Sequence, residues 1–299
     1  HEISHDILLS TNKVGFYDIP FIIYKLYHLK PDLIIAFTHY SIFISIVLKL
    51  FRWNLKIIAC HRNPWYSYPK IIKVFLYIFN KLVNITTFVS EDTKNSFYPR
   101  NGLTIINPIG FYPEVYRSHD SKLEDRFVLC VGRLSEQKNY IEFLNSLNGY
   151  SGSLRIKIVG SGPLEYELRH CIEKNNLESK VDLLGNVSHE EVINLMKDTE
   201  CFVMPSLYEG TSNSLVEALY FSKRVAINNI PSLIETSTYN ENRSAFVFNK
   251  DFNSWIELFN MIDDNSLPYK NESIIKKFDN KLFVQKYIRI IRSLSQLPS

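Results

Sequence analysis

The sequence lacks the cysteine pairs and long apolar runs that mark several protein classes. It has no CxxC pair and no Cys/His cluster at zinc-ligand spacing. A disulfide framework or structural zinc site is therefore not expected, and the four separated cysteines, three of them in strand-like runs, indicate reduced core thiols in a cytosolic protein. The longest apolar stretches, such as SIFISIVL, are well short of the roughly 20 residues of a spanning helix. We expect neither a transmembrane helix nor a signal peptide.

Several catalytic motifs are also absent or incomplete. There is no GxSxG, no GxxxxGK[ST] and no DxD. HEISH at residues 1–5 matches the HExxH zinc pattern, but it runs into the strand-like DILLS, and no third ligand follows, so we expect no zinc there. GSGPLE (160–165) begins like a dinucleotide fingerprint but has Glu165 at the last glycine position. We expect no metal and no bound cofactor.

Length and charge point to two domains of different character. A chain of 299 residues with 45% hydrophobic and 22% charged residues is long enough for two folded domains. Residues 1–120 hold 13 basic and 8 acidic side chains, whereas the remainder holds 21 and 23. The basic half includes the aromatic-rich YPKIIKVFLYIFNKL (68–82). Three interpretations stay open: a nucleic-acid surface, a face on anionic lipid, or a buried amphipathic helix with solvated lysines.

Apolar runs of strand length alternate with segments of helical period. The runs are continuous rather than alternating, which is typical of strands covered on both faces. The order strand, helix, strand predicts α/β architecture with two Rossmann-like, doubly wound parallel sheets and a cleft between the lobes. We take residues 107–125 as the linker and expect lobes over 1–112 and 113–280 and a C-terminal helix over 281–299. The expected strands are 32–37, 54–60, 84–90, 103–108, 127–132, 154–160, 180–185, 200–205 and 224–228.

Two carboxylates surround a short polar segment in SLYEGTSNSLVEALYF, which follows the strand-like CFVMP. A helix is expected to begin near Ser212 or Asn213, both good capping residues. Its first turn offers backbone N–H groups and the positive end of the helix dipole, which suits a phosphate. Glu209 and Glu217 suit the hydroxyl groups of a sugar and a ribose on either side. The alternative is a capped helix with two solvated glutamates.

A second segment, VGRLSEQKN (131–139), supplies cations at the same expected edge. Arg133 and Lys138 leave a strand end ahead of a helix, where they are placed to hold a diphosphate. On its own the motif fits two surface cations better, but the two segments together favour a nucleotide-sugar site.

These motifs resemble those of the group 1 or family 4 retaining glycosyltransferases of GT-B fold. The resemblance also rests on IVGSGPLEYEL (158–168) and on LLGNVSHEEVINLMKDTECFVMPSLYEGTSNSLVEAL (183–219). It implies that Arg133 and Lys138 hold the donor diphosphate, that Glu209 contacts the donor sugar and that Glu217 contacts the ribose. It further implies a donor site bordered by Gly160, Val187, Gly210, Thr211, Ser212 and Asn213.

In the first lobe the resemblance is thinner. IIACHRNP places His61 at a strand end, where many family members carry a histidine that faces the donor sugar, and Arg62 beside it is a candidate for an anionic acceptor. Nothing before Pro20 resembles the family's first strand and glycine-rich loop. We therefore expect the first N-terminal strand-loop-helix unit to be missing.

The resemblance implies transfer of a sugar, with retention, from a nucleotide-diphosphate donor to a glycan or lipid-linked acceptor in surface polysaccharide biosynthesis. UDP is the expected nucleotide, and the expected catalytic residues are Glu209, His61, Arg133 and Lys138. We expect no nucleic-acid partner and a cytoplasmic location with peripheral contact at the inner face of the membrane. Two alternatives stay open: a non-catalytic nucleotide-sugar-binding subunit and a GT-B nucleotide-sugar epimerase.

Overall fold

A computed structural model of the chain describes residues 18–97, 102–106, 126–238, 245–268 and 280–295. The chain forms two compact units, residues 1–105 with 285–299, and residues 106–284. The expected linker at 107–125 and the HEISH segment lie outside the described residues. So do residues 1–17, on which the expectation of a missing first unit depends. The expected α/β architecture with all-parallel sheets is confirmed in both units.

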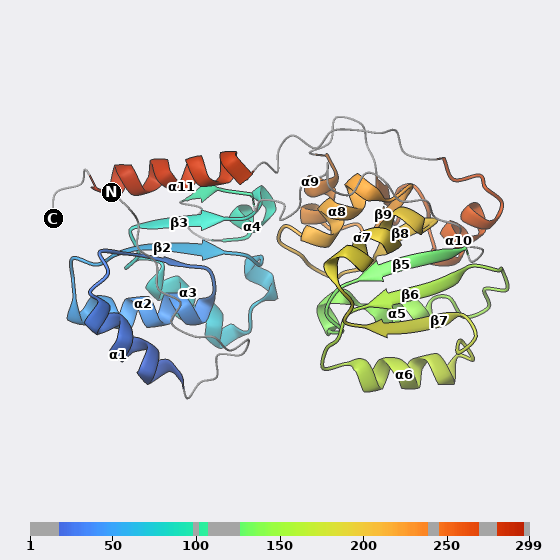
Figure 1. The fold of residues 1–299 in the computed structure, drawn as a ribbon, viewed down its shortest axis with the longest axis horizontal. Helices are drawn as coiled ribbons and strands as arrows, with labels where there is room; N and C mark the ends of the chain where they lie inside the picture. Colours follow the sequence, from blue (N-terminus) through green and yellow to red (C-terminus); the bar gives the residue numbers. More distant parts are fainter. Residues whose placement is uncertain (1–17, 98–101, 107–125, 239–244, 269–279, 296–299) are drawn as a thin grey trace. The chain divides into compact units, whose positions relative to one another are not determined.

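The first unit contains a four-stranded parallel sheet in the order β1-β2-β3-β4. Its strands are apolar and short, and both faces of the sheet are covered: Figure 1 shows α1, α2 and α3 on one side and α11 on the other. The elements are α1 (Ile19–Leu29), β1 (Leu33–Ala36), α2 (His39–Phe51), β2 (Lys56–His61), α3 (Lys70–Phe79), β3 (Ile85–Phe88), α4 (Glu91–Ser96), β4 (Leu103–Thr104) and α11 (Asn280–Ser295).

Helix α11 is joined to the first unit by polar contacts inside an apolar interface. The Tyr287 hydroxyl lies 3.2 Å from the Cys60 sulfur and 3.4 Å from the Thr87 hydroxyl. The Lys56 ammonium donates to the Leu294 carbonyl near the last turn, where a cation is favourable to the helix dipole. The C-terminal helix therefore packs on the sheet of the first unit.

The second unit contains a six-stranded parallel sheet in the order β10-β9-β8-β5-β6-β7. Alternate residues of β5 enter opposite cores: Val128 and Cys130 face one, Phe127 and Leu129 the other. This explains why the run FVLCV is continuously apolar. The elements are β5 (Phe127–Val131), η4 (Glu136–Lys138), α5 (Tyr140–Asn145), β6 (Arg155–Val159), α6 (Glu165–Lys174), β7 (Val181–Gly185), α7 (His189–Asp198), β8 (Cys201–Met204), α8 (Asn213–Phe221), β9 (Val225–Ile227), α9 (Pro231–Thr238), β10 (Ala245–Val247) and α10 (Trp255–Asp263).

All nine expected strands are present, and β10 is an additional one. The four cysteines are free and buried, which confirms the expectation of core thiols. None of the helices in the described part of the chain combines the length and apolar character that crossing a bilayer requires.

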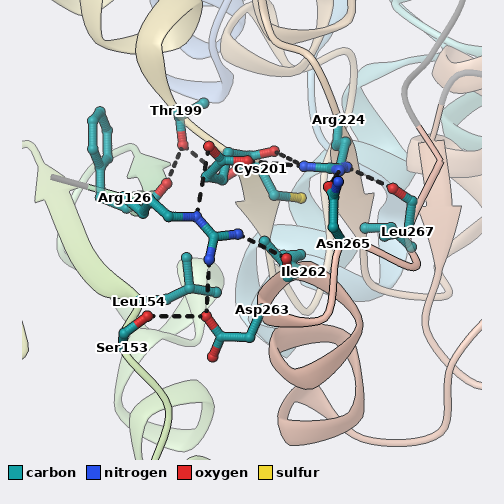
Figure 2. A network of polar contacts seen from close by, with 12 residues as sticks. Arg126, Ser153, Leu154, Thr199, Cys201, Arg224, Ile262, Asp263, Asn265 and Leu267 are labelled. Carbon is teal, nitrogen blue, oxygen red and sulfur yellow. Dashed lines mark hydrogen bonds and ion pairs between the residues drawn. The ribbon is translucent and has the colours of Figure 1, made fainter. Parts of the chain in front are cut away.

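A polar network joins the amino ends of the second unit's strands (Figure 2). Arg224, just before β9, is fully buried. Its Nε donates to the Leu267 carbonyl at 2.9 Å, its Nη1 to Glu200 Oε2 at 2.9 Å and its Nη2 to Asn265 Oδ1 at 3.0 Å. Arg126, just before β5, lies 3.9 Å from the other Glu200 oxygen. Each guanidinium nitrogen of Arg224 thus has an acceptor, which makes its burial tolerable.

Candidate functional site

The candidate site lies at the opposite edge of the second sheet, where β5 and β8 end side by side. These two strands pair directly, with Val128 opposite Cys201 and Leu129 opposite Phe202. Because parallel strands end at the same edge, the loops that follow β5 and β8 are neighbours. In open α/β sheets this carboxyl edge is where ligands bind.

Hydrogen bonds tie these two loops together. The Leu207 amide donates to the Gln137 carbonyl at 2.9 Å, and the Gln137 side-chain amide donates to the Tyr208 carbonyl at 3.0 Å. The Asn139 side-chain amide donates to the Pro205 carbonyl at 3.3 Å. The segment that carries Arg133 and Lys138 is therefore held against the segment that carries Glu209.

An ion pair lies within this double loop. Lys138 Nζ is 2.7 Å from Glu209 Oε1, and the two side chains are only 11% and 9% exposed. The Lys138 stem passes over Gly132, where a Cβ would lie 2.6 Å from Lys138 Cε. Burial, together with the Glu209 carboxylate, holds the pKa of the Tyr140 hydroxyl well above its ordinary value. The site thus places a cation and a carboxylate in a poorly solvated environment, where charge interactions are stronger than in water.

The first turn of α8 is adjacent to the end of β5. The Ser214 hydroxyl donates to the Val131 carbonyl at 3.4 Å, and the Ser212 hydroxyl lies 3.1 Å from that of Ser214. Ser212 occupies the N-cap position, as expected, but its side chain makes no capping hydrogen bond. The helix start predicted to hold a phosphate is therefore at the same edge as the Lys138–Glu209 pair.

Glu217, in the second turn of α8, is paired with a residue that the sequence analysis missed. Its Oε1 lies 3.1 Å from His189 Nε2, and the two side chains are 12% and 48% exposed. Burial raises the pKa of the Glu217 carboxyl, and the hydrogen bond from His189 opposes that shift. Its position in the sequence could have indicated this role, because His189 is the first residue of α7, directly after the loop that follows β7.

Glycine is required where β6 ends. Gly160 has φ +132°, and a Cβ there would collide with the Gly132 carbonyl oxygen. The backbone therefore approaches closely where β5 and β6 end, at the edge that carries the candidate site. Val187, expected to lie against a nucleobase, is partly buried and packs against the apolar core under α7 and α8. Donor contacts by Gly160 and Val187, and by Gly210, Thr211 and Asn213, stay predictions.

Arg133 and His61, the other two residues predicted to be catalytic, have no polar contact with the Lys138–Glu209 pair in the part of the chain that the structure describes. Arg133 is exposed, and its guanidinium has no hydrogen bond or ion pair to any described residue. A diphosphate role for it stays a prediction that its accessibility permits.

His61 is a packed residue of the first unit. It is 1% exposed, its Nε2 lies 3.1 Å from Asn80 Oδ1, and its ring packs against Phe88 and Phe97. Burial lowers the pKa of His61 to about 4, so the ring is neutral at pH 7. The strand-end position was predicted correctly, but the sugar-facing role stays a prediction that this burial does not favour. Arg62 beside it is exposed.

No three His, Cys, Asp or Glu side chains gather as a metal site among the residues that the structure describes. The cations and carboxylates of the candidate site are instead those that suit a phosphate and polyol ligand. The expectation that the reaction needs no metal stays a prediction.

Comparison with known proteins identifies the sequence family. The model of the family "Glycosyl transferases group 1" matches residues 112–277, more than half of the chain. A relative from Campylobacter jejuni, N-acetylgalactosamine-N,N'-diacetylbacillosaminyl-diphospho-undecaprenol 4-alpha-N-acetylgalactosaminyltransferase, is 32% identical over 157 residues, which are 52% of this chain and 42% of that protein. A second from the same organism, an alpha-1,4-N-acetyl-D-galactosaminyltransferase, is 29% identical over 64% of this chain and 54% of that protein. The chain thus spans about half the length of the curated relatives it matches.

Solved structures share the fold. Anabaena Alr3699/HepE in complex with UDP and glucose has a TM-score of 0.73 at 18% identity, over 93% of this chain and 83% of that one. A sucrose-phosphate synthase from Thermosynechococcus elongatus has a TM-score of 0.72 at 16% identity, over 93% and 78%. Both similarities extend across the first and second units.

Proposed function

Since the chain belongs to the group 1 glycosyl transferases, we propose that it transfers a sugar from a UDP-sugar to a hydroxyl of a lipid-linked glycan, with retention at the anomeric carbon. The Lys138–Glu209 pair at the joined ends of β5 and β8, beside the start of α8, carries the proposal. UDP is supported by the solved relative in complex with UDP and glucose. The acceptor class is supported by the Campylobacter jejuni relatives, whose names specify diphospho-undecaprenol-linked glycans.

In this mechanism, negative charge builds on the departing diphosphate as the glycosidic bond stretches. The Lys138 ammonium has three donors, and Glu209 engages one of them. The free donors, the accessible Arg133 guanidinium and the backbone N–H groups at the start of α8 stabilise the developing charge. Removing one fixed donor of this kind commonly lowers the rate by about 100- to 1,000-fold. The departing phosphate takes the acceptor proton as the new bond forms on the same face of the sugar.

Glu209 orients the donor sugar through hydroxyl groups, and Glu217 accepts hydrogen bonds from the ribose. Both carboxylates come from elements at the carboxyl edge, flanking the cationic loop. Because like charges repel, these side chains are suited to hydroxyl groups rather than to phosphate. We give His61 no part in this mechanism, because within the described residues its side chain has one polar contact, with Asn80 in the first unit.

Thermal unfolding with UDP, GDP and NAD tests the binding step. We expect UDP to raise the transition temperature of the wild-type chain and to lose most of this effect with Arg133→Ala or Glu217→Ala. Arg169→Ala is the matched control, since Arg169 is exposed on α6 and pairs with Glu165. Unchanged UDP stabilisation in both site variants would contradict the site assignment.

Release of UDP from UDP-sugars, with and without a polyprenyl-diphosphate glycan, tests the chemistry. The proposal expects UDP release that depends on the acceptor and a product with retained anomeric configuration. UDP binding with no release would identify a binding subunit. Conversion of the sugar without any acceptor would identify an epimerase.

A further inference from the structure

Exposed apolar side chains are concentrated in the first unit. In the part of the chain that the structure describes, 21 large hydrophobic residues are exposed, and 17 of them belong to the first unit, although it is the smaller of the two. Scattered exposed apolar residues are ordinary, whereas contiguous patches mark interaction surfaces. The question is which of these residues form one surface.

Helix α3 carries two adjacent stripes on its outer side. Ile71, Val74 and Ile78 recur at helical spacing and are 81%, 61% and 51% exposed. Leu82, just after the helix, continues the aliphatic stripe and is 44% exposed. Leu76 is the helix's one fully buried residue. The outer side of α3 therefore presents a row of aliphatic residues to solvent.

The neighbouring stripe is cationic. Lys70, Lys73, Tyr77 and Lys81 each precede a member of the aliphatic row by one residue. The Lys81 ammonium lies 4.7 Å from the centre of the Tyr77 ring. An exposed aliphatic row beside a lysine row is typical of a helix that lies in the headgroup region of a membrane.

The surrounding sequence has charge of one sign only. Between Asp32 and Glu91 the chain contains seven Lys or Arg residues and no Asp or Glu. This stretch includes α2 and α3, so no carboxylate from these helices offsets the lysines. Each cation near an anionic leaflet adds roughly 1 kcal/mol of attraction.

The end of α2 adds a second apolar group near the end of α3. Leu50, Phe51 and Trp53 are 75%, 69% and 79% exposed. The Lys49 ammonium donates to Asn84 Oδ1 at 2.9 Å, which joins the last turn of α2 to the segment that follows α3. An exposed tryptophan beside lysines is common where proteins meet the interfacial region of a bilayer.

We infer that the outward face of α3, defined by Ile71, Val74, Ile78 and Leu82 with Lys70, Lys73 and Lys81, binds the surface of an anionic lipid bilayer. The side chains enter the headgroup region without spanning it, and the lysines neutralise lipid phosphates. This contact is independent of the transfer reaction proposed above, because it needs neither donor nor acceptor. It would bring a site that acts on a lipid-linked acceptor to the leaflet that holds it.

Co-sedimentation of the full chain with vesicles tests the inference. We use phosphatidylcholine vesicles with and without about 30% phosphatidylglycerol, at about 0.1 M and about 0.5 M salt. We expect binding to the anionic vesicles that weakens at the higher salt. Ile71→Glu with Ile78→Glu should lower the partition coefficient by about tenfold or more, because both charges would enter the apolar layer. Lys70→Gln, Lys73→Gln and Lys81→Gln together should lower the partition coefficient and weaken its dependence on salt.

Tyr166→Glu with Leu184→Glu is the matched control, since both residues are exposed apolar positions of the second unit. This variant should bind vesicles as the wild type does. Far-UV circular dichroism and UDP-dependent thermal shift check that each variant is folded. Failure of the wild type to bind anionic vesicles, or unchanged binding by the α3 variants, overturns the inference. So does a wild-type dimer that the Ile71→Glu, Ile78→Glu variant makes monomeric without any effect on lipid, since the face would then bind a second copy.

Discussion

The two edges of the second sheet each hold a buried ion pair, and the pairs differ in how completely they are bonded. At the amino edge, all three nitrogens of the Arg224 guanidinium donate to acceptors, among them Glu200. At the carboxyl edge, Lys138 has a single side-chain partner within the described residues, Glu209. A fully bonded pair can only hold its neighbours in place, whereas a partly bonded one keeps donors and acceptors for a ligand.

The difference also follows from the role of each edge in such sheets. At the amino edge, the Arg224 guanidinium joins the segments just before β8 and β9 to Asn265, which follows α10 (Figure 2). In open α/β sheets the carboxyl edge is where ligands bind. We therefore expect a buried cation with a glutamate to stabilise the fold at the amino edge and to bind a ligand at the carboxyl edge.

The contrast between the two edges would be wrong if the Arg224–Glu200 pair could be removed with little loss of the free energy of unfolding. Arg224→Met should lower the free energy of unfolding by about 3–5 kcal/mol, because it leaves the largely buried Glu200 carboxylate and the Leu267 carbonyl without their donor. Urea unfolding followed by Trp255 fluorescence, in a Trp53→Phe, Trp65→Phe background, reports on the second unit alone. The matched control is Arg169→Met.

That control removes the exposed pair of Arg169 and Glu165, which are 2.8 Å apart. The expected cost is within about 0.5 kcal/mol, because surface pairs contribute little. Equal costs for Arg224→Met and Arg169→Met would mean that the amino-edge network does not hold the fold.

The Lys138–Glu209 pair at the carboxyl edge is tested by its effect on the rate of the reaction rather than on stability. Lys138→Met should lower kcat/KM by about 100- to 1,000-fold, because a fixed donor to the leaving diphosphate is lost. Glu209→Gln should also lower kcat/KM. The double variant should lower it by far less than the product of the two single effects, since both side chains act in one site. Lys174→Met, which changes an exposed residue of α6, should keep the wild-type rate. An additive double variant would contradict a shared role.

His61 extends the comparison to the first unit, because it too is a fully surrounded polar group. Its folded pKa of about 4 lies below the ordinary value of about 6.5, so the unfolded chain binds the proton more tightly. The stability it contributes is present above about pH 6.5 and is lost as pH falls toward 4, by roughly 3 kcal/mol.

Urea unfolding at pH 7 and pH 4 measures this, and His61→Gln should lose less stability over that range than the wild type. The same variant should retain transfer activity. A 100-fold slower reaction with an unchanged pH dependence of stability would instead support the sugar-facing role.

The sequence allowed the parallel sheets to be predicted because buried strands are continuously apolar, and all nine expected strands exist. It also predicted that the loops after β5 and β8, which form the candidate site, lie at one edge, since their polar residues follow strand ends. It could not identify the contact between Lys138 and Glu209, which are 71 residues apart and were expected to bind different parts of the donor. The burial of His61 depends on Phe88 and Phe97, which come from later segments of the chain. Local pattern therefore locates strand ends, while the partners of each side chain depend on tertiary packing.

The smallest expected effect concerns Glu217 and His189, which form a more exposed pair than Arg224–Glu200 or Lys138–Glu209. Burial raises the pKa of Glu217 and the hydrogen bond from His189 lowers it again. UDP affinity should therefore fall as pH drops through this raised pKa, because a protonated carboxyl accepts hydrogen bonds from a diol less well. His189→Gln should move that fall to higher pH by weakening the ionised form, while changing the affinity at pH 8 only about threefold or less.

Calorimetric titration of UDP from pH 5 to pH 8 measures this effect, with Glu217→Gln as the pH-independent reference. Among the described residues, His189 is the group that opposes the effect of burial on the Glu217 pKa, so the profile reports on this pair. A His189→Gln profile that overlays the wild type would show that the imidazole does not tune the carboxylate. Glu217 would then behave as a saturated structural group like Glu200, and the contrast between the two edges would rest on Lys138 and Glu209 alone.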